Sequence, residues 1–504
     1  MAFKRNNIST AERIEIGLQV LQYRGIYGCV TDLARKYSVS RWFIYFCFHL
    51  VLVFHREIDN PKKYQVQPAY VINKTLEEQA LILYLDTKAS ISGIRHGIKN
   101  LTGEDISTGQ ISQILNDYGE LVGHGESINI RLKFISDEIF INGDPVLITI
   151  EPGSGFILRL DLADKRDAET WGYCWLEIVD NETGRVERII ADQAKGIIGG
   201  IGLVFDDVKK LYQTDLFHVI VRLGYWIGVL ERQAYSAINN EYEAGRKFQN
   251  AKSENVLEGR MEKYEAAKIE SEKLVNLYDD FVYLFRELQN ILMIMDMKTG
   301  NLRKKNEVIA EIDAILCLME EEIDYEKIQD GVKYFRKHQD ALLRYFDDVE
   351  EADEELKKLI PDEFVRQIFV LIYGYQSQSY TAYGQRKLFL KEQIDELKQM
   401  LGEYAGEVKF EQSYPLVEKQ LSSIIRSSSM VENTNSRLRP FFDAARGQIN
   451  QNRLNLIRFY LNHKVFERGR RKGKSPAQIL YGEKAASESW FSILQAKKAE
   501  KEAA

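Results

Sequence analysis

The sequence predicts a multi-domain α+β protein in which a mixed α/β core is interrupted by a large all-α insertion and preceded by two small helical units. Runs of β-branched residues bounded by turn residues are concentrated between residues 131 and 218. No proline occurs from Gly153 to Ile360, and beyond about Val219 the chain is rich in Glu, Lys, Leu and Tyr, which is typical of long helices. With 504 residues, the chain is also too long for a single core.

Composition excludes several classes of protein. The four cysteines, at positions 29, 47, 174 and 317, are too widely spaced to indicate disulfides or a structural zinc site, so we expect a reducing compartment. The first residues, MAFKRNN, are polar and predict no secretory signal. The apolar run from Phe43 to Phe54 is too short to span a membrane and contains His49, so we expect a buried helix there and no membrane partner.

The N-terminal region contains two patterns typical of a helix-turn-helix. Ser9 or Thr10 can cap a first helix, and the segment TDLARKY is followed by a turn at 38–40 and a helix starting at Ser40 or Arg41. A second unit comprises LEEQALILYLDT, SISGIRHGIKNLTG and DISTGQISQILNDYG. We predict two DNA-binding domains, 1–60 and 61–128, in which Arg41, Thr108 and Gln110 contact bases. Alternatively, both units are merely small helical bundles.

A strand at 131–141 opens the core, because alternation places Ile135, Asp137, Ile139 and Ile141 on one face. Asn142-Gly143 predicts a hairpin, and the runs PVLITI and GFILRLDL complete an antiparallel meander. Asp167 can cap a following helix with Trp171, Trp175 and Ile178 on one face. The strand in VERIIADQAKG then ends at Asp192 and leads into a glycine-containing turn.

This order of elements resembles the opening of an RNase H-like fold, in which Asp137 and Asp192 can be neighbours in one sheet. Two adjacent carboxylates repel each other unless a cation lies between them. Mg²⁺ prefers oxygen ligands, and a two-metal site can hold both the attacking and the leaving oxygen of a phosphodiester. The alternative is that each Asp is an ordinary acid at a strand end or in a loop.

The helical insertion is predicted at 221–418. A helical hairpin is expected between residues 253–295 and VIAEIDAILCLMEEE, with a turn at 298–301. Trp226 is expected to pack in a helical core, although stacking on a flipped base is the alternative. The acidic run at 347–351 is predicted to be a solvated face or linker.

A third acid follows the insertion. RSSSMVENTNSRLRP predicts a helix in which Val431 and Leu438 share one face, and the adjacent face carries Glu432, Asn435, Ser436 and Arg439. Pro440 is expected to begin the next helix. Although the formal net charge is −7, the stretch 453–474 contains eight Lys and Arg residues against a single Glu. Such a stretch can neutralise phosphates, or it can be a basic solvated loop.

Five segments resemble the successive blocks of a DDE transposase from a bacterial insertion sequence: ISDEIFINGDPVLITI, DKRDAETW, RIIADQAKG, TDLFHV and SSMVENTNSRLRPFFD. The resemblance implies that Asp137, Asp192 and Glu432 are catalytic and hold Mg²⁺ or Mn²⁺, with two ions expected. Asp215 and His218 resemble the [C/D]xxH signature of hAT-like and Mutator-like transposases, and hAT enzymes carry a helical insertion at the same place. His218 either orients a nucleophile or phosphate, or only braces Asp215.

The resemblance also implies an RNase H-like core divided into 129–220 and 419–480, followed by a tail at 481–504. The expected partners are double-stranded DNA, as element ends and target, and further copies of the chain in a homodimer or higher oligomer. Arg439, Arg470, Arg471 and Lys472 are the expected phosphate contacts, and the expected location is the cytoplasm, associated with the nucleoid. The rival prediction is a non-catalytic, domesticated DNA-binding regulator that retains the fold.

Overall fold

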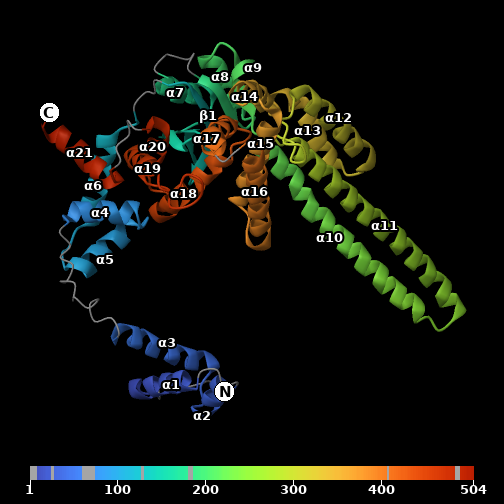
Figure 1. Ribbon diagram of the computed structural model, residues 1–504, viewed down its shortest axis with the longest axis horizontal. Helices are drawn as coiled ribbons and strands as arrows, with labels where there is room; N and C mark the ends of the chain where they lie inside the picture. The colour runs from blue at the N-terminus through green and yellow to red at the C-terminus, as the bar shows by residue number, and fades with distance from the viewer. Residues whose placement is uncertain are drawn as a thin grey trace. The chain divides into compact units, whose positions relative to one another are not determined.

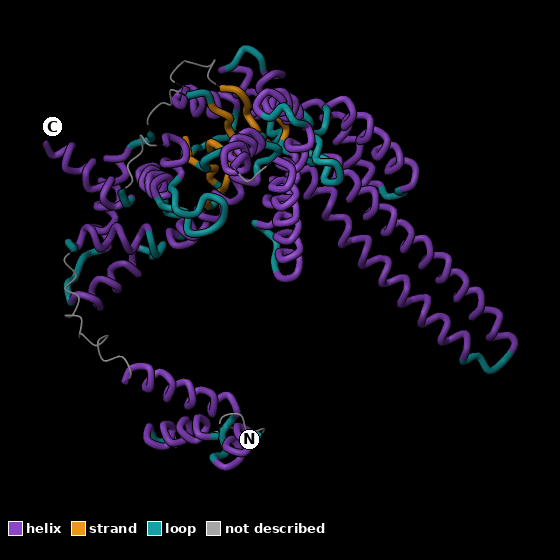
Figure 2. The backbone as a smooth tube through the Cα atoms, in the orientation of Figure 1, coloured by secondary structure: helices purple, strands orange, loops and turns teal. Residues whose placement is uncertain are grey.

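The computed structural model describes residues 8–23, 28–58, 74–125, 130–179, 186–405, 408–482 and 488–503. The chain divides into two compact units, Met1–Thr75 and Leu76–Ala504 (Figure 1). The predicted boundary between residues 60 and 61 falls outside the described residues. Helices predominate, and the strands belong to the second unit (Figure 2).

The first unit contains α1 (Thr10–Gln22), α2 (Cys29–Lys36) and α3 (Arg41–Ile58). Ser9 and Glu12 form the capping box of α1, and α2, the turn and α3 lie where the helix-turn-helix pattern predicted them. The prediction that 43–54 is a buried helix is wrong for one face of α3. Phe43, Ile44 and Cys47 are buried, whereas Tyr45 is 58% exposed, because only one stripe of α3 packs on α1 and α2.

The second predicted helix-turn-helix consists of α4 (Leu76–Leu85), α5 (Ile91–Thr102) and α6 (Thr108–Val122). It does not have a core of its own, because Leu81, Ile98 and Leu115 belong to the same hydrophobic cluster as Ile135 of the sheet. The predicted segment 61–128 is therefore divided: its described helices belong to the larger compact unit.

The sheet has five strands in the order β3-β2-β1-β4-β5. Their bounds are β1 Leu132–Ile141, β2 Asp144–Glu151, β3 Phe156–Leu162, β4 Val186–Ala191 and β5 Tyr212–Thr214. β1, β2 and β3 pair antiparallel as predicted, whereas β1 pairs parallel with β4, and β4 with β5. At the predicted hairpin, Asn142 and Gly143 both have positive φ, 52° and 100°.

One face of the sheet is covered by α7 (Ala168–Val179) and α8 (Lys195–Val204), with Trp171 and Trp175 fully buried as predicted. The turn expected after Asp192 is in fact α8. Its glycines allow close packing on α7, since a Cβ on Gly200 would lie 2.8 Å from the Trp171 Cβ. The short helix α9 (Val208–Leu211) leads into β5.

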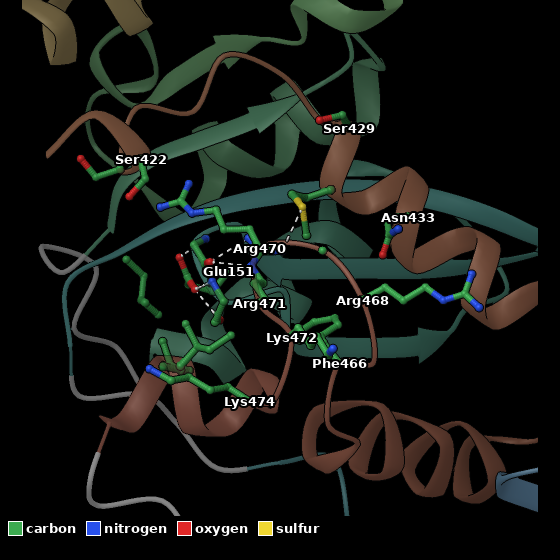
Figure 3. A pocket seen from close by; sticks show the side chains of 18 of the residues that line it. Glu151, Ser422, Ser429, Asn433, Phe466, Arg468, Arg470, Arg471, Lys472 and Lys474 are labelled. Carbon is green, nitrogen blue, oxygen red and sulfur yellow. Dashed lines mark hydrogen bonds between the residues drawn. The ribbon is translucent and has the colours of Figure 1, made fainter. Parts of the chain in front are cut away.

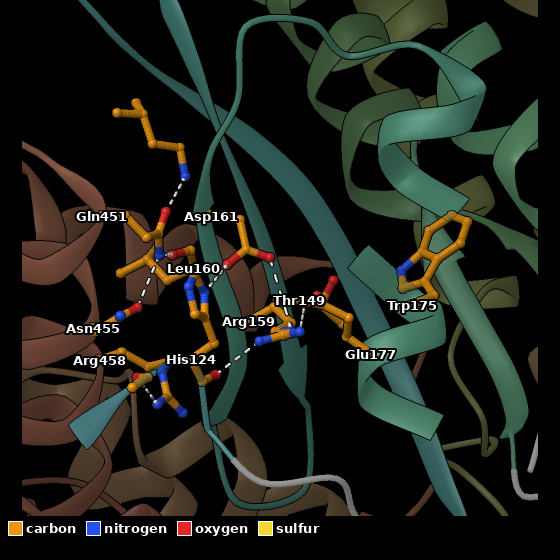
Figure 4. A network of polar contacts seen from close by, with 12 residues as sticks. His124, Thr149, Arg159, Leu160, Asp161, Trp175, Glu177, Gln451, Asn455 and Arg458 are labelled. Atoms are coloured by element: carbon orange, nitrogen blue, oxygen red, sulfur yellow. Dashed lines mark hydrogen bonds and ion pairs between the residues drawn. The ribbon is translucent and has the colours of Figure 1, made fainter. Parts of the chain in front are cut away.

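The opposite face is covered by α18 (Ser429–Ala445) and α19 (Gln451–His463). Helix α19 also protects the edge strand β3 (Figure 4). Gln451 accepts from Leu162 N at 2.8 Å and donates to Leu160 O at 2.9 Å, and Asn462 pairs in the same way with Ile157. These amide side chains satisfy backbone groups that an open edge would leave unpaired.

The all-helical block begins with α10 (Leu216–Gln249), α11 (Glu254–Ile291), α12 (Lys305–Glu322) and α13 (Glu326–Leu342).

 The block continues from α14 (Tyr345–Leu359) through α15 Glu363–Ser379, α16 Gly384–Ala405 and α17 Val408–Ser422. The predicted hairpin of α11 and α12 is present, with Gly300 at φ +76° in its turn. The long antiparallel pairing of α10 with α11 was not predicted (Figure 1). Phe248 of α10 stacks on Tyr264 of α11. Trp226 packs beside Tyr325, as expected of a core residue.

The acidic run at 347–351 is not simply a solvated face. Asp348 accepts hydrogen bonds from Lys133 Nζ at 2.8 Å and Arg188 Nη2 at 2.9 Å, and its side chain is only 13% exposed. Lys133 belongs to β1 and Arg188 to β4. This ion-pair network therefore joins α14 of the helical block to the centre of the sheet.

Two further helices, α20 (Pro476–Tyr481) and α21 (Trp490–Ala503), complete the described chain. Pro440 does not begin a helix, contrary to prediction, but lies within α18. Pro440 and Ser436, four residues earlier, are both exposed, so water can satisfy the carbonyl left without an N–H partner. The predicted tail is anchored, because Trp490 and Leu494 of α21 are buried against α6 and α19.

Candidate active site

Asp137 lies on the face of β1 that carries Ile135 and Ile139, as the alternation predicted. The parallel pairing of β1 with β4 ends at Ile135↔Ile190, two residues before Asp137 and two before Asp192. Asp137 lies within β1, whereas Asp192 directly follows Ala191, the last residue of β4. Asp192 Oδ1 accepts from the Ala194 N–H at 2.8 Å, and Tyr212 donates to the Asp192 carbonyl oxygen at 3.0 Å.

Helix α18 brings the third predicted acid to this face. Val431 and Leu438 are buried against the sheet, and Glu432 follows Val431 on the neighbouring side of the helix. Asn435, one turn after Glu432, donates from Nδ2 to Asp137 Oδ2 at 3.1 Å. A hydrogen bond thus joins β1 to α18 across 298 residues of sequence.

Asp137 is electrostatically perturbed. The pKa of this carboxyl is raised to about 6, chiefly by burial and to a smaller extent by the charge of Glu432, although the hydrogen bond from Asn435 and the charge of His218 act in the opposite direction. His218 is in turn influenced by the charges of Asp137 and Asp192, which contribute to its raised pKa after the larger effect of its hydrogen bond to Asp215. Glu432 and His218 therefore lie within electrostatic range of Asp137, and Asp192 lies within electrostatic range of His218.

Asp215 is the buried centre of a second polar cluster. Its side chain is 0% exposed and accepts hydrogen bonds from Ser428 N at 2.8 Å, Ser428 Oγ at 2.5 Å and Phe217 N at 3.0 Å, and it also bonds His218 Nδ1. Although burial opposes ionisation, the bonds from His218 and Ser428 hold the pKa of Asp215 below its usual value. Bracing of Asp215 by His218 was one of the two predicted roles.

The link from Asp215 to Ser428 was not predicted. Ser428 is the N-cap of α18, but its hydroxyl points to Asp215 and makes no side-chain cap. Gln213 of β5 adds a hydrogen bond to the Ile425 carbonyl oxygen at 2.9 Å. The start of α18, and hence Glu432, is therefore fixed to the end of β5. A serine before a helix signals an N-cap, but no sequence signal identifies a partner 213 residues away.

The polar groups beside Asp137 include oxygen atoms that could coordinate a metal ion. Asn435 Oδ1 is buried without a hydrogen-bond partner, beside the carboxylate that Asn435 Nδ2 contacts. Together with the carboxylates of Asp137 and Glu432, this amide oxygen suits a hard divalent cation. Among the described residues, however, no three His, Cys, Asp or Glu side chains are close enough to form a metal-binding group. The metal site of Asp137, Asp192 and Glu432 stays a prediction.

The candidate base-reading residues lie at helix starts. Arg41 is exposed in the first turn of α3, beside the 63% exposed Trp42. Thr108 and Gln110 are exposed in the first turn of α6. The Gln110 Oε1 accepts from Ser107 N at 3.0 Å in a capping box, so its Nε2 is the group left to meet a base.

The basic stretch 453–474 divides into structural and exposed residues. Arg453 and Arg458 are buried on α19, where Arg453 donates to Ser112 Oγ at 2.7 Å and Arg458 to the Gly123 carbonyl oxygen at 3.0 Å. Arg471 donates to the carbonyl oxygens of Pro152 and Gly153, both at 2.7 Å (Figure 3). Arg471 was predicted to contact phosphate, but its guanidinium is already hydrogen-bonded to these backbone carbonyl groups.

The other predicted phosphate contacts are exposed. Arg439 lies on the outer side of α18, and Lys472 is exposed in the loop before α20. Arg470 is also exposed but pairs with Glu418 of α17 at 3.4 Å.

Among the described residues, no helix combines the length and the apolarity needed to cross a membrane. Comparison of the chain with protein-family models and with curated proteins finds no match.

Proposed function

We propose that the protein is a DDE transposase that binds the ends of its mobile element, cleaves the DNA and joins the free 3′-hydroxyl to target DNA. The hydrogen bond from Asn435 to Asp137 carries this proposal, because it brings the helix of Glu432 to the strand of Asp137. The strand order β3-β2-β1-β4-β5, with antiparallel β1–β2 and parallel β1–β4, supports an RNase H-like core. The helical block that separates β5 from α18 supports a hAT-like insertion. Fold alone does not define chemistry, so the acids must be tested directly.

The proposed chemistry depends on Mg²⁺ or Mn²⁺ held by Asp137, Asp192 and Glu432; when bound, the ions would activate water and stabilise the leaving oxygen. Asn435 orients the Asp137 carboxylate, and Asp215 fixes His218 through Nδ1. Nε2 of the 45% exposed His218 is left to donate to a phosphate oxygen or a water molecule. Double-stranded DNA and further copies of the chain are the proposed partners, and a nucleoid-associated cytoplasmic location follows from this function.

Glu432→Gln tests the proposal. Glutamine keeps the volume of the side chain but removes the charge, so the variant should bind element ends like the wild type and lose cleavage and strand transfer by several orders of magnitude. Asp443→Asn is the matched control, because Asp443 is an exposed acid on the same helix. It should retain activity. Retained strand transfer in Glu432→Gln would show that the third acid is misassigned. If the wild type joins no ends with Mg²⁺ or Mn²⁺, the protein is a non-catalytic DNA-binding regulator.

A further inference from the structure

A basic cleft of about 900 Å³ is lined in part by α18, the helix that carries Glu432 (Figure 3). It is bordered by the β2–β3 turn, the start of α18 and the loop 466–474, and we call it the 466–474 cleft. Its basic lining residues are Arg131, Arg468, Arg470, Arg471, Lys472 and Lys474, and Glu151 is the acid among the lining residues. The Glu151 carboxylate is itself occupied by the Gly153 and Ser154 N–H groups, both at 2.6 Å.

We infer that the 466–474 cleft binds the phosphodiester backbone of DNA through Arg468, Lys472 and Lys474, with Arg471 as a structural support. This inference rests on the proposed function and extends it to residues outside the acids. Arg468, Lys472 and Lys474 are exposed, and no described acid forms an ion pair with any of them. Arg470 is not included among these phosphate contacts, because it already forms an ion pair with Glu418 at 3.4 Å.

Arg471 differs from these residues in burial and bonding. Its guanidinium contacts the carbonyl oxygens of Pro152 and Gly153 and lies 3.1 Å from the Met430 sulfur. Burial lowers the pKa of Arg471, as expected for a guanidinium largely removed from water. Arg471 therefore ties the loop to the β2–β3 turn and to α18, which shapes the cleft.

The cleft suits phosphates better than bases. Phe466 is the aromatic residue in its lining, and the guanidinium groups of Arg437 and Arg471 lie over its ring, 5.3 and 5.9 Å from the centroid. A base that stacked on Phe466 would have to displace them. Exposed cations without a stacking platform favour sequence-independent contact with the sugar-phosphate backbone.

Helix α18 connects the cleft to the acids. Ser429, Met430 and Asn433 line the cleft, whereas Glu432 and Asn435 belong to the Asp137 site. A DNA backbone bound in the cleft thus follows the same helix that carries the third acid. The cleft is expected to hold DNA flanking the scissile phosphate.

The test measures binding of a labelled random-sequence duplex without divalent metal, as a function of salt. Loss of two phosphate contacts in Lys472→Gln/Lys474→Gln should weaken binding and reduce the slope of log K against log[salt] by about 2. Lys387→Gln/Lys391→Gln is the matched control, because both lysines are exposed on α16. Glu418→Gln should act in the opposite direction and tighten binding, because it releases Arg470.

Wild-type affinity and slope in Lys472→Gln/Lys474→Gln would overturn the inference, as would equal competition by polyglutamate and by unlabelled duplex at the same charge concentration. The inference and the proposed function fail separately. Normal duplex binding by this variant, together with strand transfer by the wild type, refutes only the cleft. Weakened duplex binding, together with no strand transfer by the wild type, refutes only the transposase.

Discussion

Asp137 is a carboxyl group whose charge the folded protein disfavours. Its pKa rises from 3.8 to about 6 on folding, so the folded state binds a proton more tightly than the unfolded chain. The resulting stability is present at low pH and is lost as pH rises towards 6. At neutral pH the ionised group destabilises the metal-free protein by an amount on the order of 3 kcal/mol.

Asp137→Asn should therefore raise the melting temperature of the metal-free protein at pH 7.5, with little gain at pH 4. The same variant should lose any stabilisation that Mg²⁺ gives the wild type, because the amide carries no charge for the ion. Thermal melts at both pH values, with and without Mg²⁺, measure both effects. Asp144→Asn, at an exposed strand end, is the control and should respond equally at both pH values. An equal gain for Asp137→Asn at both pH values contradicts the prediction.

Asp215 has the opposite character, because folding lowers its pKa and raises that of His218. The ionised Asp215 stabilises the folded state, and this stability is lost as pH falls through the folded pKa of Asp215. The protonated His218 also stabilises the folded state, and this stability is lost as pH rises through the folded pKa of His218. Asp215→Asn should destabilise the protein by about 3 kcal/mol and flatten this pH dependence on both sides. Urea denaturation between pH 3 and 9 checks it. Asp207 is an exposed N-cap of α9, and Asp207→Asn is the control that should change the unfolding free energy little. If Asp215→Asn is as stable as the wild type, the Asp215–Ser428 contact does not stabilise the fold.

Residues whose roles depend on local pattern were predictable from the sequence. Alternation alone put Asp137 on the face of Ile135, and the capping box of Ser9 and Glu12 is a three-residue signal. Asp348 and Arg471 were misinterpreted because their partners lie far away in the sequence: Arg188 is 160 residues from Asp348, and Pro152 is 319 residues from Arg471. Charge runs in a sequence do not distinguish a solvated group from one that contacts buried backbone.

At the scale of elements, periodicity predicted the strands and the major helices, whereas proline and glycine were misleading. Pro440 continues α18, and Gly199 and Gly200 allow α8 to approach α7 rather than forming a turn. Both glycines are located in a helix whose packing is decided by tertiary contacts. A single glycine or proline therefore marks an element boundary only where no neighbouring element requires a close approach.

The contact between α6 and α19 gives a test at this scale. A Cβ on Gly119 would lie 1.9 Å from the Asn452 carbonyl oxygen, whereas one on Gly109, near the start of the same helix, would meet nothing closer than 3.8 Å. Gly119→Ala should lower stability by about 1 to 3 kcal/mol, because α6 and α19 must separate. Gly109→Ala should be neutral or slightly stabilising. Equal unfolding free energies for the two variants in urea would contradict this packing.

At the scale of the whole molecule, the main difference from the sequence prediction concerns the second helical unit. Its pattern of three short helices resembles that of the first unit, so local sequence cannot reveal which unit has an independent core. Leu81 and Leu115 are fully buried in a cluster shared with Ile135 and Leu454. Helices α4–α6 therefore contribute to folding of the core as well as to any DNA contact.

This distinction predicts different outcomes for two deletions. Removing residues 1–75 deletes one compact unit, so the remaining chain should keep its melting temperature and its affinity for random duplex, while the footprint on the element ends becomes shorter. Removing residues 1–125 also strips Leu81 and Leu115 from the shared core and should leave a chain that melts at a lower temperature or does not fold. Thermal melts and footprinting of both truncated proteins check this. If the footprint keeps its full length after removal of residues 1–75, the first unit does not contact the element ends. If the melting temperature stays at the wild-type value after removal of residues 1–125, helices α4–α6 do not support the core.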